Sequence, residues 1–110
     1  MPKTFDLDAL MSELELDRED VVELFDDFKG FITETLPELK AVIEAGDFAK
    51  SRTLSHSIKG SAGNLRIQEV YALSKQMQED SENSNQQALN DNLAKLEPAV
   101  VEFLEELKTL

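Results

Sequence analysis

The stretch "VVELFDDFKGFITETLPELKAVI", residues 21–43, decides how this chain folds. Its apolar residues advance in steps of four and three, which places them along one stripe of an α-helix. The stripe consists of Val21, Phe25, Phe28, Ile32, Leu36, Leu39 and Ile43. A long helix with a single apolar stripe is typical of a helix that packs within a bundle.

Pro37 lies within this stripe, so either one helix or two could cover it. A proline in a helix interior removes a hydrogen bond and kinks the helix. Alternatively, Thr35 and Glu38 match the capping box with which a new helix would start. Because the stripe continues on both sides of the proline, we expect one kinked helix.

The rest of the chain also favours helices, because no stretch alternates apolar and polar residues for long. A short helix is predicted ahead of Asp17, which suits the N-cap of the long helix. Gly46 suits the end of that helix, and Asp47 can cap a third helix over residues 48–65. Two further helices follow, the last with a kink predicted at Pro98. Their apolar positions are Val70, Leu73 and Met77, and then Leu89, Leu93, Leu96, Val100, Phe103, Leu107 and Leu110.

These segments predict an all-α protein, an up-and-down four-helix bundle with a short extra N-terminal helix. A chain of 110 residues can bury one core, so we expect a single domain over residues 1–110. The absence of cysteine excludes disulfides and thiolate metal sites. No apolar run is long enough to span a membrane and the first residues lack a secretory-signal pattern, so we expect a cytoplasmic protein.

The charge of the chain limits the classes of partner that it can bind. The chain has 11 basic and 23 acidic residues, for a formal net charge of −12. Nucleic acids and anionic membrane surfaces both require clustered Lys and Arg, so both are disfavoured. This leaves another protein as the partner, or a small-molecule enzyme with few catalytic residues.

The stretch "LSHSIKGSAGNLR", residues 54–66, contains the only histidine, His56. On a helical wheel, Arg52, Lys59, Gly60 and Gly63 fall within about 60° of His56, which therefore points outward. The opposite side holds Leu54, Ile58 and Leu65, flanked by Ser51, Ser61 and Ala62. Each glycine costs a helix about 1 kcal/mol relative to alanine. We interpret the glycines as room for another protein's pocket beside the imidazole; alternatively, they let a neighbouring helix pack closely and His56 is incidental.

The spacing of His56, Lys59 and Gly60 within "HSIKGSAGNL" closely resembles the signature of the histidine-containing phosphotransfer (HPt) domain family. The resemblance is specific over residues 54–79 and extends more loosely to the whole chain. Members of that family are helical bundles that relay phosphoryl groups between receiver domains. The resemblance implies that His56 carries the phosphoryl group, that Lys59 lies beside it, and that Gly60 leaves room for the receiver. Gln78 stands where some members have a glutamine that orients the imidazole.

The resemblance also implies the partners, namely response-regulator receiver domains and, where one is present, a hybrid sensor kinase. We expect no cofactor or metal on this chain, with Mg²⁺ held by the receiver, and Arg52 and Gly63 at the docking surface. Because the chain lacks an ATP-binding loop, we expect a phosphoryl carrier and not an enzyme. Arg66 departs from the family, which often has glycine there, and we expect this to affect the turn or the docking rim more than the chemistry. A monomer is expected because the working face must stay exposed, although four–three stripes also permit dimers.

The chemistry of an imidazole supports the carrier function independently of the resemblance. An ordinary histidine is partly unprotonated near neutral pH, so a ring nitrogen can attack phosphorus. Lys59 and Arg52 can neutralise phosphate charge. The main alternative is a catalytically inactive helical adaptor that binds a protein through an apolar groove.

Three other functions fit the sequence less well. A hydrolase that used His56 as general base would also need a nucleophile and a pocket. A metal site needs more ligands than one histidine. The sequence "GSAG" fits the GxxG loop of KH domains, but the charge and the lack of strands disfavour nucleic-acid binding.

Overall fold

A computed structural model of the chain describes residues 4–110. The described residues form five α-helices and no strand, which confirms the all-helical prediction. The helices are α1 (Leu7–Leu14), α2 (Arg18–Glu44), α3 (Phe48–Asn64), α4 (Gln68–Glu82) and α5 (Gln86–Leu107). Within residues 4–110, no helix combines the length and apolar character that a membrane crossing requires.

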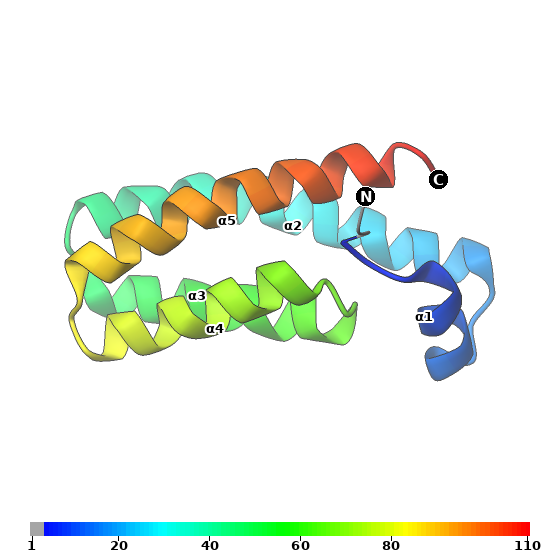
Figure 1. Ribbon diagram of the computed structural model, residues 1–110, viewed down its shortest axis with the longest axis horizontal. Coiled ribbons are helices and arrows are strands. Elements are labelled where there is room, and N and C mark those ends of the chain that lie inside the picture. Colours follow the sequence, from blue (N-terminus) through cyan, green and yellow to red (C-terminus); the bar gives the residue numbers. More distant parts are fainter. Residues whose placement is uncertain (1–3) are drawn as a thin grey trace.

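The four longer helices lie side by side in a helical bundle, with α2 and α5 above α3 and α4 in Figure 1. Each of them contacts two others, through the pairs α2–α3, α3–α4, α4–α5 and α2–α5. The short α1 packs against α2, near the start of that helix (Figure 1). The molecule is 42 Å long and 22 Å across. Since α3 contacts only α2 and α4 among the longer helices, one side of it is left at the surface.

The long helix α2 runs through Pro37 without a break from Arg18 to Glu44. The prediction of one helix is therefore confirmed, and the alternative of a new start at Thr35 is wrong. The Asp17 side chain caps α2 by accepting a hydrogen bond from the Asp20 backbone N–H at 3.0 Å. Helix α5 likewise continues through Pro98.

The turn between α2 and α3 uses the two residues that the sequence indicates. Gly46 has a φ of 71°, a left-handed conformation that favours glycine after the end of a helix. Asp47 follows it, and its side chain accepts a hydrogen bond from the Lys50 backbone N–H at 3.1 Å. This cap sets where α3 begins, and therefore the direction in which its His56 side faces.

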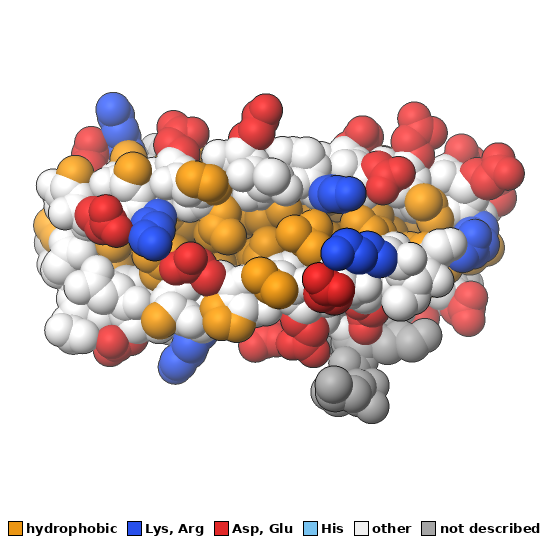
Figure 2. Space-filling model, turned by 90° about the horizontal axis from the view of Figure 1, so that it is seen from above, with side chains coloured by type: hydrophobic (Ala, Val, Ile, Leu, Met, Phe, Trp, Pro, Cys, Tyr) orange, Lys and Arg blue, Asp and Glu red, His pale blue; other side chains and the backbone are white. Residues whose placement is uncertain are grey.

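The core lies between the layers and is richest in aromatic residues where α2 meets α5. Phe103 of α5 lies 6.0 Å from Phe25 and 5.5 Å from Phe28, measured between ring centroids. Phe5, which precedes α1, packs 4.5 Å from Phe25. Figure 2 looks onto α2 and α5 and shows hydrophobic side chains along the middle of that face, with acidic ones along its edges. The apolar stripe of α2 is buried in this core except at Leu36, which is half-buried.

Helices α3 and α4 have several buried serines, and two of them meet across the helices. Ser51 and Ser55 of α3 and Ser74 and Ser81 of α4 are all buried. The Oγ atoms of Ser51 and Ser81 form a hydrogen bond of 2.7 Å across the two helices. Small side chains let helix axes approach closely, so α3 and α4 form a tight pair.

A buried carboxylate joins α4 to α5. Asp80 is 5% exposed, and it accepts hydrogen bonds from Gln76 Nε2 at 2.9 Å and from Asn92 Nδ2 at 2.7 Å. Both carboxylate oxygens therefore have an amide partner, as a buried charged group requires.

Two alanine substitutions at these buried polar positions should have opposite effects on stability. Ser55 Oγ is buried and has no hydrogen-bond partner within residues 4–110, so Ser55→Ala should raise the free energy of unfolding by about 1 kcal/mol. Asp80→Ala should lower it by about 1–3 kcal/mol, because the amides of Gln76 and Asn92 would lose their acceptor. Urea denaturation followed by circular dichroism measures both, and a destabilised Ser55→Ala would contradict the first expectation.

Candidate functional site

His56 lies on the solvent side of α3, as the helical wheel predicts. Arg52 and Gly60 are exposed beside it, while Lys59 and Gly63 are half-buried. The opposite side is buried at Ser51, Ser55, Ile58, Ala62 and Leu65. Three positions differ from the prediction. Leu54 and Ser61, expected on the core side, are only half-buried, and Ser55 is buried although it was not expected there. Ser55 lies one helical turn from Ser51, which bonds to Ser81 of α4, so Ser55 falls on the side of α3 that packs against α4.

Three side chains form a connected row that ends on the imidazole. His56 Nδ1 lies 3.2 Å from Gln78 Oε1 on α4. Gln78 Nε2 donates to Glu82 Oε1 at 3.1 Å, and Arg52 Nε of α3 donates to the same oxygen at 3.3 Å. Arg52 and Glu82 have 53% and 44% of their side-chain surface exposed, so this ion pair is screened by water. The structure thus brings Gln78 to His56 and holds Arg52 against Glu82.

Glu82 is not among the site residues predicted from the sequence, although the sequence carries a signal for it. Gln78 and Glu82 are four residues apart, and residues at this spacing are neighbours on the surface of a helix. The spacing alone does not show that the pair faces His56, because that depends on how α3 and α4 pack together.

The charges around His56 differ from those of the rest of the chain. Helix α3 contains Lys50, Arg52 and Lys59 but no Asp or Glu, in a chain whose formal net charge is −12. None of the salt bridges found within residues 4–110 involves Lys59, whereas Arg52 is paired with Glu82. Lys59 is therefore the cation on this side of α3 best able to neutralise an anion beside the imidazole.

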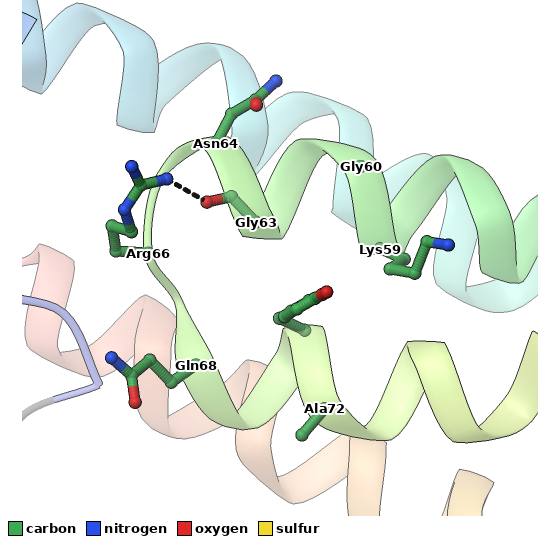
Figure 3. A pocket seen from close by; sticks show the side chains of 8 residues that line it. Lys59, Gly60, Gly63, Asn64, Arg66, Gln68 and Ala72 are labelled. Carbon is green, nitrogen blue, oxygen red and sulfur yellow. Dashed lines mark hydrogen bonds between the residues drawn. The ribbon is translucent and has the colours of Figure 1, made fainter.

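An open cavity of about 670 Å³ begins one helical turn from His56 and runs between α3 and α4 (Figure 3). Its lining residues are Lys59, Gly60, Gly63, Asn64, Arg66, Gln68, Tyr71 and Ala72. A Cβ atom placed on Gly60 would meet nothing within 4 Å, so close helix packing is not what Gly60 provides. A Cβ atom on Gly63 would lie 3.8 Å from Tyr71 Cδ2, an ordinary contact. Gly60 thus faces open space, and Gly63 faces the ring of Tyr71.

Arg66 lies in the turn after α3 and has a φ of 57°, in the left-handed region that favours glycine. This conformation explains physically why a glycine suits the position. The Arg66 side chain forms two contacts that glycine could not form. Its Nη1 donates to the Gly63 carbonyl oxygen at 2.7 Å (Figure 3), and its Nε donates to Glu13 Oε2 of α1 at 3.1 Å. Arg66 therefore links α1 to the end of α3.

Within residues 4–110, no group of three or more His, Cys, Asp or Glu side chains is arranged to hold a metal ion.

Comparison with known proteins gives one match. Residues 23–110 match the family model of the Hpt domain. No curated protein and no solved structure matches the chain. The matched region contains α3 and α4 in full, with His56 and Gln78, whereas α1 lies outside it.

Two substitutions of Arg66 should separate its backbone strain from its side-chain contacts. Arg66→Ala removes both contacts and keeps a side chain in the left-handed conformation, whereas Arg66→Gly removes the contacts and relieves the strain. We expect the alanine variant to be less stable than the glycine variant by about 1 kcal/mol in urea denaturation. Equal stabilities would mean that the turn relaxes out of the left-handed conformation when Arg66 is replaced.

Proposed function

We propose that this chain, which belongs to the Hpt domain family, is a histidine phosphotransfer module that carries its phosphoryl group on His56. The observation that supports this most is the exposed imidazole, whose Nδ1 lies 3.2 Å from Gln78 Oε1. An amide oxygen only accepts, so the neutral tautomer that fits this contact has its proton on Nδ1 and its lone pair on Nε2. The arrangement we propose for this function is the up-and-down four-helix bundle, supported by the four pairwise contacts of α2 to α5.

In the transfer step, the Nε2 lone pair of His56 attacks the phosphorus of an aspartyl phosphate on the receiver. The N–P bond forms, the bond from phosphorus to the aspartate oxygen breaks, and the carboxylate leaves with that electron pair. The proton on Nδ1 stays in its hydrogen bond to Gln78. Reversal of the same step returns the phosphoryl group to an aspartate, so the module can serve as donor or acceptor.

The surroundings of His56 suit this step. Lys59 lies one turn along the same side of α3 and would neutralise part of the phosphoryl charge. Gly60 would let the receiver approach, with Gly63 and Arg52 at the rim of the docking surface. The receiver, alone or within a hybrid sensor kinase, would supply the aspartyl phosphate and Mg²⁺. We place this exchange in the cytoplasm, with a monomer as the working form.

Phosphoryl uptake tests the proposal directly. The chain is mixed with phosphorylated receiver domains and Mg²⁺, and the protein is assayed for phosphate that is labile in acid and stable in base. We expect uptake by the wild-type chain and none by His56→Gln, because the variant lacks the attacking nitrogen.

Circular dichroism of both proteins is the control that each is folded. If the folded wild-type chain takes no phosphate from any of several receivers, the carrier function is wrong and the adaptor function replaces it. Equal labelling of wild type and His56→Gln would place the phosphate on another residue.

Gly60 and Gly30 offer a matched pair for the docking surface. Both are exposed helical glycines, and a Cβ atom on either would meet nothing within 4 Å. Gly60→Ala and Gly30→Ala should each raise the free energy of unfolding by about 1 kcal/mol. Only Gly60→Ala should slow uptake from the receiver, by about tenfold, because its methyl group would stand where the receiver docks. Equal rates for the two variants would show that the receiver does not cover Gly60.

A further inference from the structure

We propose that Glu82 is a positioning residue that determines which ring nitrogen of His56 is free to attack phosphorus. This inference rests on the proposed function of His56. It assigns a role in that function to Glu82, which does not itself contact the imidazole. It is carried by the row of hydrogen bonds from Arg52 and Gln78 to a single oxygen of Glu82.

The amide of Gln78 can present either of two groups to His56. Its oxygen accepts a hydrogen bond, and its NH₂ group donates one. If the oxygen faces the ring, as it does here at 3.2 Å from Nδ1, the tautomer with the proton on Nδ1 is favoured. If the NH₂ group faced the ring, Nδ1 would have to accept, and the proton would move to Nε2. The orientation of one amide thus decides whether Nε2 has a lone pair.

Glu82 favours the first orientation because an ionised carboxylate can only accept hydrogen bonds. Its Oε1 lies 3.1 Å from Gln78 Nε2, so the NH₂ group is held on the side away from His56. A rotated amide would place its own oxygen against the carboxylate and lose this bond. Glu82 therefore acts on the imidazole through Gln78, without touching the ring.

Arg52 holds Glu82 in place from the other helix. Its Nε donates to the same Oε1 at 3.3 Å, which joins α3 to α4 beside the imidazole. Two donors from two helices thus share one oxygen of Glu82, which fixes where that oxygen lies. This gives Arg52 a part in orienting the ring in addition to its place at the docking rim.

The test reads the tautomer of His56 in the unphosphorylated chain by ¹⁵N nuclear magnetic resonance, at a pH where the ring is neutral. The wild-type chain should show a protonated Nδ1 and an unprotonated Nε2. In Glu82→Ala the ratio of this tautomer to the other should fall by about fivefold. This is the change in an equilibrium that follows from the loss of one exposed hydrogen bond of about 1 kcal/mol. Glu82→Gln, which keeps an accepting oxygen, should restore part of the ratio.

The matched control is Glu79→Ala, which removes the same charge from an exposed residue of the same helix. It should leave the tautomer ratio unchanged. An equal fall in Glu79→Ala and Glu82→Ala would overturn the proposal, because the effect would then come from net charge alone.

A second variant separates positioning from a general structural role. In Gln78→Ala, no amide joins Glu82 to His56 Nδ1, so the ring no longer depends on Glu82. Adding Glu82→Ala to Gln78→Ala should therefore leave the tautomer ratio unchanged. A fall of the same size as in the wild-type background would overturn the proposal, because Glu82 would then act by a route other than Gln78.

This readout does not require phosphoryl transfer, so the two proposals fail separately. A normal response of the tautomer to Glu82→Ala together with no phosphoryl uptake would retain Glu82 as a positioning residue and reject the carrier function. Normal uptake with an unchanged tautomer ratio in Glu82→Ala would retain the carrier and reject the role of Glu82.

Discussion

The close pairing of α3 with α4 is the constraint on which the site depends. His56 is on one helix and Gln78 is on the other, so the 3.2 Å contact between them exists only at one spacing and one register. Buried serines set that spacing, because larger side chains would force the axes apart. The hydrogen bond between Ser51 and Ser81 adds a polar contact that fits a single register. The residues that build the site therefore lie on the buried side of α3 as much as on its exposed side.

The exposed side of α3 combines three properties that are unusual in this chain. It carries the single histidine, it is basic within an acidic protein, and Gly60 leaves backbone uncovered beside the ring. Each cation here is exposed or half-exposed, so in the proposed function each contact with a phosphoryl group would be worth only about 1 kcal/mol or less. Weak individual contacts would suit the proposed carrier, because a phosphoryl group that is bound tightly is not passed on.

Much of this structure could be predicted from the sequence, and the part that could not has a common physical cause. The stripe from Val21 to Ile43, the caps Asp17 and Asp47, and the outward side of α3 all follow from periodicity within one helix. The bond of Glu82 to Gln78 beside the ring and the pairing of Arg66 with Glu13 depend on how two elements meet. The buried place of Ser55 has the same origin, since it follows from the approach of α4. Helical spacing describes one element at a time and carries no information on these contacts.

The residues that weaken the bundle and the contacts that stabilise it lie in different layers. Gly60 and Gly63 lower the helix propensity of α3 by about 1 kcal/mol each, and the serines at its interface with α4 bury less apolar surface than leucines would. These losses must be offset elsewhere, and the aromatic contacts between α2 and α5 lie where no site residue is required. An open surface beside His56 is compatible with a stable protein because the opposite layer supplies most of the core. The layer of α2 and α5 binds no partner in the proposed function. Its contacts thus supply the stability that lets α3 keep an open surface beside His56.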